Sequence, residues 1–299
     1  MKLTSRPGFW DHVFDWYDTG RHKVSRLVIG FTAYATAIYA LNELTPKWLE
    51  FGIAEAPYEV AGGALSVLLV LRTNAGHDRW WEARKLWGGI TNQSRNLAVV
   101  ALANGPTDHQ WRLEFVGWVA AFGHVARRNL RGEIPSKEDL AALVGTEQAD
   151  RIAAAQHGPT AVALTLANLL REARDNDAFD RFAYLQAEEQ RALLIDHIGG
   201  CERILKTPLA TAYVVLIRRF MVLFFLTLPF ALMPRVGWLT APFTMLIAYP
   251  ILALDQIADD LQHPFSTRSI NHLPLDAITA TIEGDLLALV AADRPANVA

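Results

Sequence analysis

The stretch Val60–Leu71 reads VAGGALSVLLVL and lies between Glu59 and Arg72. As an α-helix it would reach about 18 Å, which is shorter than the hydrocarbon core of a bilayer at about 30 Å. A helix that crosses a membrane here must carry Glu55 and Glu59 to membrane depth. Carboxylates are tolerated at that depth mainly where they face water or a partner. The stretch therefore predicts a membrane helix that lines an aqueous space.

Three further uncharged apolar runs accompany this stretch, and together the four runs form two hairpins. The alternative is that they are buried helices of a soluble protein, but four apolar runs with charged ends are hard to hide in one core. The predicted membrane helices lie at about 26–44, 56–76, 216–234 and 236–255.

The placement of lysine and arginine predicts the orientation. Five such residues precede the first run, whereas the loop 43–59 carries only Lys47 against four glutamates. Basic residues favour the cytoplasmic side, so both termini and the long middle are expected there. The net charge of -3 and the pI near 6.3 give no argument for nucleic acid. The single Cys201 excludes an internal disulfide.

The middle of the chain is too polar for membrane and too periodic for disorder. Apolar residues at helical spacing predict helices, and no segment shows strand alternation. Pro135 and Ser136 open a further short helix in a looser connector, with Ser136 and Asp139 as its cap. Near the start, Phe9–Tyr17 fits either an interfacial helix or packing against the bundle. The longer helices are expected at 78–103, 111–130, 159–174 and 188–205, the last interrupted at 199–200.

The predicted fold is therefore an all-α membrane protein. The cytoplasmic helical region, at about 77–212 and 256–299, is expected to extend the membrane helices rather than to form a separate domain. The whole chain, 1–299, then forms one domain with four membrane helices per subunit.

Glu59 and three residues of the second run form one stripe of a helix, since they follow at steps of four: Glu59, Gly63, Val67 and Leu71. Gly62 and Ser66 beside them are small enough for close helix packing. Copies of the chain around an axis would turn the stripe into stacked rings, acidic at the outer mouth and apolar below, and apolar constrictions gate by dewetting. The alternative is that the three lower residues pack inside their own bundle.

Two polar segments flank the runs. RWWEARKLW at Arg79–Trp87 combines belt aromatics with expected Arg79–Glu82 and Glu82–Lys85 pairs, and Arg79, Trp80 and Trp81 read as an anchor where a pore helix leaves the bilayer. After the fourth run, Asp255, Asp259 and Asp260 fit a solvated helix end, a metal site or a contact between subunits. They lack the ligand spacing of a calcium loop.

Enzyme signatures are scarce. All nine histidines lie outside the runs, and neither H-E-x-x-H nor a phosphate-binding G-x-x-x-x-G-K-[ST] occurs. No run has an interior carboxylate for a proton relay. An enzyme, a cofactor and a bound metal are therefore not expected.

These residues give the chain a close resemblance to the bestrophin family, in its bacterial branch. The order of segments agrees over nearly the whole chain. The matching segments are RTNAGHDRWWEARKLWGGITNQSRNLA at 72–98, GGCERILKTPLATAY at 199–213, LPFAL at 228–232 and DQIADDLQHPF at 255–265.

The resemblance implies a homopentamer with one ion pathway, a narrow neck and a cytoplasmic vestibule. The family's neck positions fall on Gly63, Val67 and Leu71, and its cytoplasmic constriction on Phe182. Family necks usually carry bulky Ile or Phe, so Gly63 predicts a wider or shorter constriction. In animal members an acidic run binds calcium after the P-F pair, whereas here Ser266–Ile270 follows, and calcium gating is not expected.

The selectivity of such a channel follows from its ring of side chains. Animal bestrophins pass chloride, and aromatic neck rings can present electropositive edges to an anion. This neck has no aromatic ring, and Glu59 would place a carboxylate ring at its mouth, which favours monovalent cations. An anion channel of the same architecture and a non-conducting scaffold are the alternatives. The expected partners are further copies of the chain, membrane lipids and monovalent ions.

Overall fold

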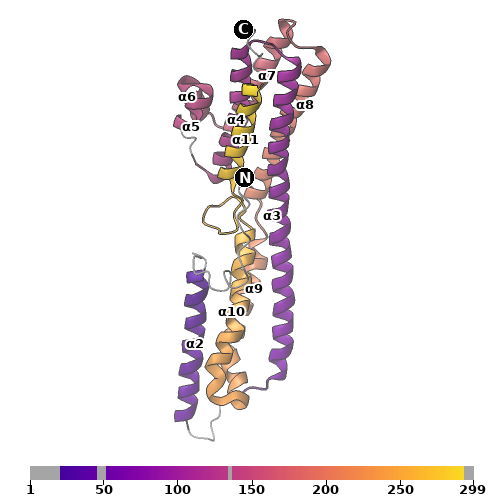
Figure 1. Cartoon of the computed structure of the whole chain (residues 1–299). Coiled ribbons are helices and arrows are strands. Elements are labelled where there is room, and N and C mark those ends of the chain that lie inside the picture. Colours follow the sequence, from indigo (N-terminus) through magenta and orange to yellow (C-terminus); the bar gives the residue numbers. More distant parts are fainter. Residues whose placement is uncertain (1–20, 46–51, 134–136, 293–299) are drawn as a thin grey trace. The chain divides into compact units, whose positions relative to one another are not determined.

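A computed structural model of the chain describes residues 21–45, 52–133 and 137–292, and these residues form helices without any strand. The predicted all-α class is thereby confirmed for this part of the chain. The apolar set Phe9–Tyr17 and the cap at Ser136 lie outside it. The helices are α2 Arg21–Leu44, α3 Ala56–Asn104, α4 His109–Arg131, α5 Lys137–Val144, α6 Thr146–Ala154, α7 Gly158–Asp175, α8 Arg181–Lys206, α9 Thr211–Val236, a 3₁₀ turn Gly237–Leu239, α10 Thr240–Leu261 and α11 Leu275–Ala292 (Figure 1).

The chain divides into two compact units, each with its own apolar core. The first unit comprises 1–78, 209–263 and 268–271, and the second comprises 79–208, 264–267 and 272–299. Helix α3 contributes to both, because the short apolar run continues without a break into the polar helix after it. The prediction that these two segments form one helix is confirmed.

In the first unit, α2 packs against α9 and α10, and Figure 1 shows α2 beside α10. Leu65 and Leu69 of α3 are buried with Phe224 and Phe225 of α9 in the same core. Two stretches of helix are long and apolar enough to cross a membrane, Lys23–Leu44 and Thr211–Leu261. The apolar part of α3 does not reach that standard by itself, in agreement with its short run.

Helix α9 tolerates two prolines in its apolar run. Pro234 has no N–H, so the carbonyl of Phe230 loses its helical partner. The N–H of Ile53 donates to this carbonyl instead, at 3.2 Å. The loop before α3 thus satisfies a group that a proline leaves free, which is how membrane helices retain prolines.

In the second unit, α4 lies at the centre and packs against α5, α7, α8 and α11. Trp87 of α3 and Phe115 and Phe122 of α4 are fully buried there. Two details differ from the prediction. Helix α6 occupies the expected loose connector, and α8 runs through Gly199–Gly200 without interruption. A Cβ on Gly200 would lie 2.9 Å from the side chain of Leu86, so this glycine permits close packing and does not end the helix.

Candidate functional site

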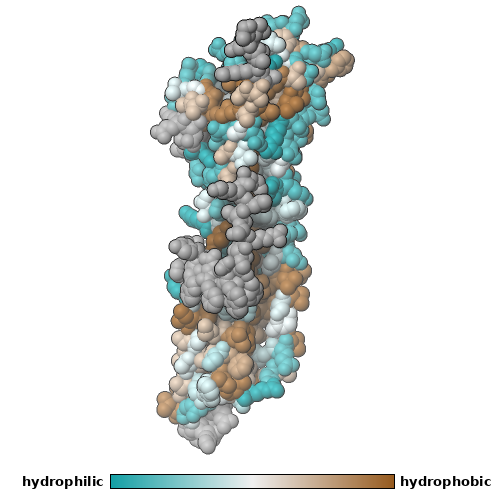
Figure 2. Space-filling view, viewed as in Figure 1, coloured by the Kyte–Doolittle hydropathy of each residue, from teal (hydrophilic) through white to brown (hydrophobic). Residues whose placement is uncertain are grey.

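The predicted stripe lies on the surface of the first unit. Val67 is 60% and Leu71 53% exposed, and a Cβ on Gly63 would meet no atom within 4 Å. Leu65 and Leu69, on the other side of α3, are buried. The alternative that these three residues pack inside their own bundle is therefore wrong: α3 buries its opposite face and leaves the stripe without cover. Exposed apolar side chains gather elsewhere on this unit as well, as the brown patches in Figure 2 show.

One carboxylate begins this exposed stripe, and another lies about two turns beyond its last residue, Leu71. Glu59 lies exposed in the first turn of α3, and the Asp78 side chain, five turns along the same helix, is 85% exposed. Glu55 belongs to a different arrangement, since it pairs with Arg235 at 2.6 Å. Of the two glutamates that precede the run, only Glu59 stands on the stripe.

The small residues beside the stripe already have a partner within the chain. A Cβ on Gly62 would lie 3.7 Å from the ring of Phe224, so Gly62 faces α9. The hydroxyl of Ser66 donates to the carbonyl of Gly62 at 2.8 Å. The Gly62 position therefore serves packing inside the protomer rather than packing between copies.

Four charged side chains form a cluster in the first unit, at the end of the apolar run of α3. The guanidinium of Arg72 pairs with Asp255 and lies 3.2 Å from Asp259. Arg218 bonds the same two carboxylates, at 3.2 and 3.0 Å. The Arg72 side chain is completely buried. Buried arginine is stable only with such partners, so this cluster fixes α3 against α9 and α10.

This arrangement corrects the interpretation of the acidic segment. Asp255 and Asp259 are not a simple solvated helix end, because they pair with Arg72 and Arg218 of their own chain. Asp260 accepts a hydrogen bond from Gln256 at 2.9 Å. Within the described ranges, no three His, Cys, Asp or Glu side chains come together as a metal site.

Arg79, Trp80 and Trp81, the residues predicted as an anchor, make contacts within the second unit. Arg79 donates to the carbonyls of Ile204 and Thr207, both at 2.6 Å, and so caps the end of α8. Burial lowers the pKa of Arg79 below its usual value, and the nearby carboxylate of Glu82 offsets this effect only in part. Trp80 packs against the core and stacks on the half-exposed Trp81, with 6.5 Å between ring centroids.

The local charge pairs also differ from those expected in this segment. Glu82 forms an ion pair with Arg203 of α8 at 2.7 Å. The predicted pairs with Arg79 and Lys85 followed from spacing along one helix. The contact with a second helix was not visible in that spacing.

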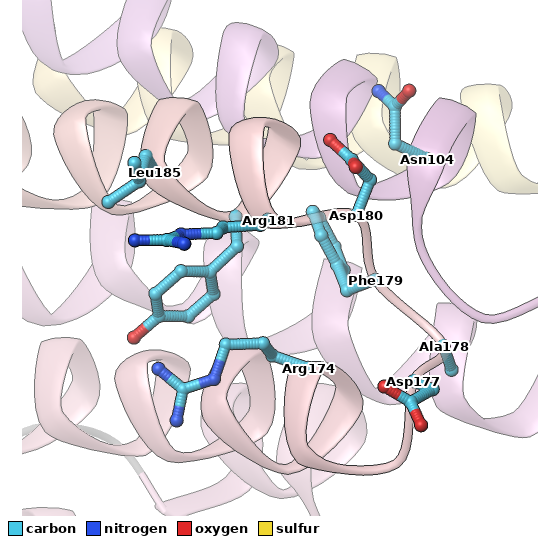
Figure 3. Close-up of a pocket in the computed structure, with 9 residues that line it drawn as sticks. Asn104, Arg174, Asp177, Ala178, Phe179, Asp180, Arg181 and Leu185 are labelled. Atoms are coloured by element: carbon cyan, nitrogen blue, oxygen red, sulfur yellow. The ribbon is translucent and has the colours of Figure 1, made fainter.

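Phe182 stands in the first turn of α8 and is 79% exposed. Asp180 caps this helix by accepting from the N–H groups of Phe182 and Ala183, at 2.9 and 3.1 Å. The loop before it lines an open hollow of about 920 Å³ (Figure 3). On its wall, the guanidinium of Arg174 lies 4.7 Å from the ring centroid of Tyr184. The cap and this contact hold the turn that presents Phe182.

The described side chains do not form an arrangement for covalent chemistry. Cys201 is buried, and burial raises the pKa of its thiol to about 12. The histidines His124 and His157 bond Glu283 and Glu202 and tie helices together. What the first unit offers is an exposed apolar stripe between two carboxylates.

The chain matches the family model described as Bacterial/Fungal Bestrophin protein over residues 1–288. It is 34% identical to the voltage-dependent anion channel-forming protein YneE of Escherichia coli K12, over 92% of this chain and 89% of that protein. A protein of the same description from Ralstonia nicotianae is 35% identical, over 79% and 78% of the two chains.

Solved structures give the same result. The crystal structure of a bacterial bestrophin homologue from Klebsiella pneumoniae superimposes with a TM-score of 0.83 at 28% identity, covering 88% of this chain and 97% of that one. Another match, with a TM-score of 0.83, is described as a membrane protein. The predicted fold class is thereby confirmed: an all-α membrane protein with four membrane helices per subunit and a further helical region.

Proposed function

Because the chain belongs to the family of bacterial and fungal bestrophin proteins, we propose that it is a passive ion channel whose pore runs between copies of the chain. A role as a channel rather than an enzyme agrees with the relatives described as anion channel-forming proteins. The observation that carries the proposal is that the exposed face of α3 combines apolar side chains with the exposed carboxylates of Glu59 and Asp78, because a face that met only lipid would not carry such charges.

In this proposal the stripe forms the neck. Gly63, Val67 and Leu71 of each copy make stacked apolar rings, with Glu59 as a carboxylate ring at the outer mouth. An apolar constriction holds water poorly, so it can close without a mechanical plug. Gly63 has open space around its Cβ, which supports a neck that is wider at this level than at Leu71.

The assembly follows from the resemblance to the family. Five copies surround the axis, and the two units of each chain act as one channel domain over 1–299. Phe182 forms the second constriction, and its exposure at a capped helix start supports a ring of this residue around an opening. The chain lies in the inner membrane with both termini in the cytoplasm, and Arg79, Trp80 and Trp81 anchor α3 where it leaves the bilayer.

The preferred ions are monovalent cations. Glu59 at one end of the stripe and Asp78 about two turns beyond the other are both exposed, and carboxylate rings attract cations. Near the end of the apolar run, Arg72 and Arg218 are already neutralised by Asp255 and Asp259. Arg219, which has no ion pair in the part of the chain that the structure describes, lies on α9, outside the stripe. An anion channel is the second candidate, and the descriptions of the relatives favour it.

Single-channel recordings in planar bilayers decide between these two functions. Under a potassium chloride gradient the reversal potential is expected to move toward the potassium equilibrium potential, and Glu59→Gln is expected to weaken this preference. Glu147→Gln is the matched control, since this exposed glutamate of α6 is already paired with Arg151. A reversal at the chloride potential would show an anion channel.

Two further measurements test assembly and conduction separately. Mass photometry of the purified protein counts the subunits, with five expected. Ion flux from liposomes that contain the protein separates a channel from a scaffold that assembles without conducting. Assembled protein without flux would overturn the proposal of a channel.

A further inference from the structure

One side of α9 carries a shallow, open groove of about 410 Å³ in the first unit. Its apolar wall is exposed, with Leu223 the most accessible at 60%. Two arginines interrupt this wall. The lining residues are Val215, Arg218, Arg219, Val222, Leu223 and Leu226.

The two arginines differ in their charge balance. Arg218 bonds Asp255 and Asp259, and together with Arg72 these four groups carry two positive and two negative charges, which cancel. Arg219 is exposed, and no side chain within the described ranges forms an ion pair with it. The groove therefore holds one uncompensated positive charge in apolar surroundings.

The bonded cluster also fixes the depth of this charge in the membrane. Arg72 ends the second apolar run, Arg218 precedes the third and Asp255 ends the fourth. Because these residues contact one another, the three runs end at one level, where the hydrocarbon core gives way to the headgroups. Arg219 lies at this level, and Val222, Leu223 and Leu226 lie one to two turns further into the apolar run.

We propose that this groove binds an anionic phospholipid of the leaflet at that end of the runs. Its phosphate pairs with Arg219, and one acyl chain lies along Val222, Leu223 and Leu226. A free phosphate would leave the apolar wall bare, and a zwitterionic lipid would leave the charge of Arg219 only partly compensated. The inference rests on membrane insertion and not on conduction, so it stands whether or not the chain forms a pore.

Native mass spectrometry of the full-length protein tests this site. Protein reconstituted with equal amounts of phosphatidylglycerol and phosphatidylcholine is expected to retain phosphatidylglycerol selectively. Arg219→Gln is expected to reduce the retained phosphatidylglycerol about five-fold, since one basic residue near an anionic surface contributes an effect of this size. Arg219→Lys keeps the positive charge and is therefore expected to retain most of the phosphatidylglycerol.

Arg181→Gln is the matched control, because it removes one exposed positive charge from the second unit. A second pair of variants tests the apolar wall. Leu223→Asn is expected to lose lipid, whereas Leu246→Asn is expected to retain it, because Leu246 is a comparably exposed residue of α10 that lies outside the groove.

The same spectra contain the outcomes that overturn the proposal. Equal retention of the two lipids by the wild-type protein would show that the groove does not select an anionic lipid, and this result does not depend on whether a variant folds. A loss of subunits in Arg219→Gln with unchanged lipid per chain would show that the groove is a contact between copies.

Discussion

The guanidinium of Arg72 forms an ion pair with the carboxylate of Asp255, and this pair joins α3 to α10 at the ends of their apolar runs. Both groups are removed from water, with side-chain exposures of 0% and 13%. A buried ion pair costs several kcal/mol of desolvation per charge, which its partners must offset. The position of the helix that carries the stripe therefore depends on a complete set of charges.

Removal of Arg72 alone is expected to destabilise the first unit strongly. Arg72→Leu leaves the carboxylate of Asp255 buried with one arginine instead of two. Loss of one member of a buried pair typically costs about 3–5 kcal/mol. Thermal unfolding in detergent, followed by tryptophan fluorescence, should show a clear fall in the apparent Tm.

Combining Arg72→Leu with Asp255→Asn should recover part of that loss, because the unpaired charge is then gone. Arg218→Leu is the comparison, and a smaller effect is expected since this side chain is 47% exposed. Equal Tm values for Arg72→Leu and the wild type would contradict the structural role of the pair.

The sequence predicted the helices well because their signals are local. The short run at Val60–Leu71, its charged flanks and the four-residue spacing of the stripe are all visible in the order of residues. Helix α8 was misjudged at Gly199–Gly200, because two glycines read as a break when the side chain of Leu86 that packs on Gly200 is not known.

Contacts between distant segments were the part that sequence could not provide. In the sequence Arg72 marked only the charged end of the second run, and Asp255 belonged to an acidic set. Their pairing joins positions far apart in the chain, and no periodicity reports it. The only related signal in the sequence was the charged residue at the end of each apolar run. It indicates a contact only once the runs are known to lie side by side.

A smaller side chain at Leu71 should open the neck in the proposed channel. Leu71→Ala is expected to raise flux or remove its regulation, because a wider and less apolar ring wets more easily. Val70→Ala is the matched control. It is 55% exposed against 53% for Leu71, but it points about 100° away around the helix. Unchanged liposome flux in Leu71→Ala would indicate that Leu71 does not line the pathway.

A larger side chain at Gly63 should narrow the same pathway. The space around its Cβ is open within the protomer, so Gly63→Phe is expected to fold and assemble normally. Its rings would add a constriction above Val67 and reduce the single-channel conductance severalfold. Gly30→Phe on α2, which has equally open surroundings, should leave conductance unchanged. The same reduction in both variants would point to a general effect on the membrane unit.

Lysine should not be able to replace Arg79 in capping the end of α8. Its two nitrogens reach the carbonyls of Ile204 and Thr207 at once, whereas one ammonium cannot reproduce the planar geometry. Arg79→Lys is expected to weaken the last turn of α8 by about 1–2 kcal/mol, seen as faster hydrogen exchange there. Arg203→Lys alters a surface pair with side-chain exposures of 66% and 43%, so it should change little. Equal exchange in both variants would contradict the cap.

Acid should weaken the second unit partly through Glu202. Burial raises the pKa of this carboxyl, but hydrogen bonds from His157 and Asn129, at 2.5 and 2.6 Å, outweigh it and hold the pKa below its usual range. A carboxyl with a lowered pKa stabilises the fold above its unfolded pKa and loses this contribution as pH falls through the folded value. The contribution should therefore shrink from about pH 5 downward, as pH falls through the ordinary range of a glutamate and then through the lowered pKa of Glu202.

Glu202→Gln separates this contribution from the general effect of acid. The variant should melt below the wild type at pH 7, and the difference should shrink as pH falls through that window, because the wild-type carboxyl becomes neutral as well. Glu189→Gln, an exposed position on the same helix, should keep a small and constant difference. A Tm difference for Glu202→Gln that does not change with pH would mean that the ionised carboxylate does not stabilise the junction of α4, α7 and α8.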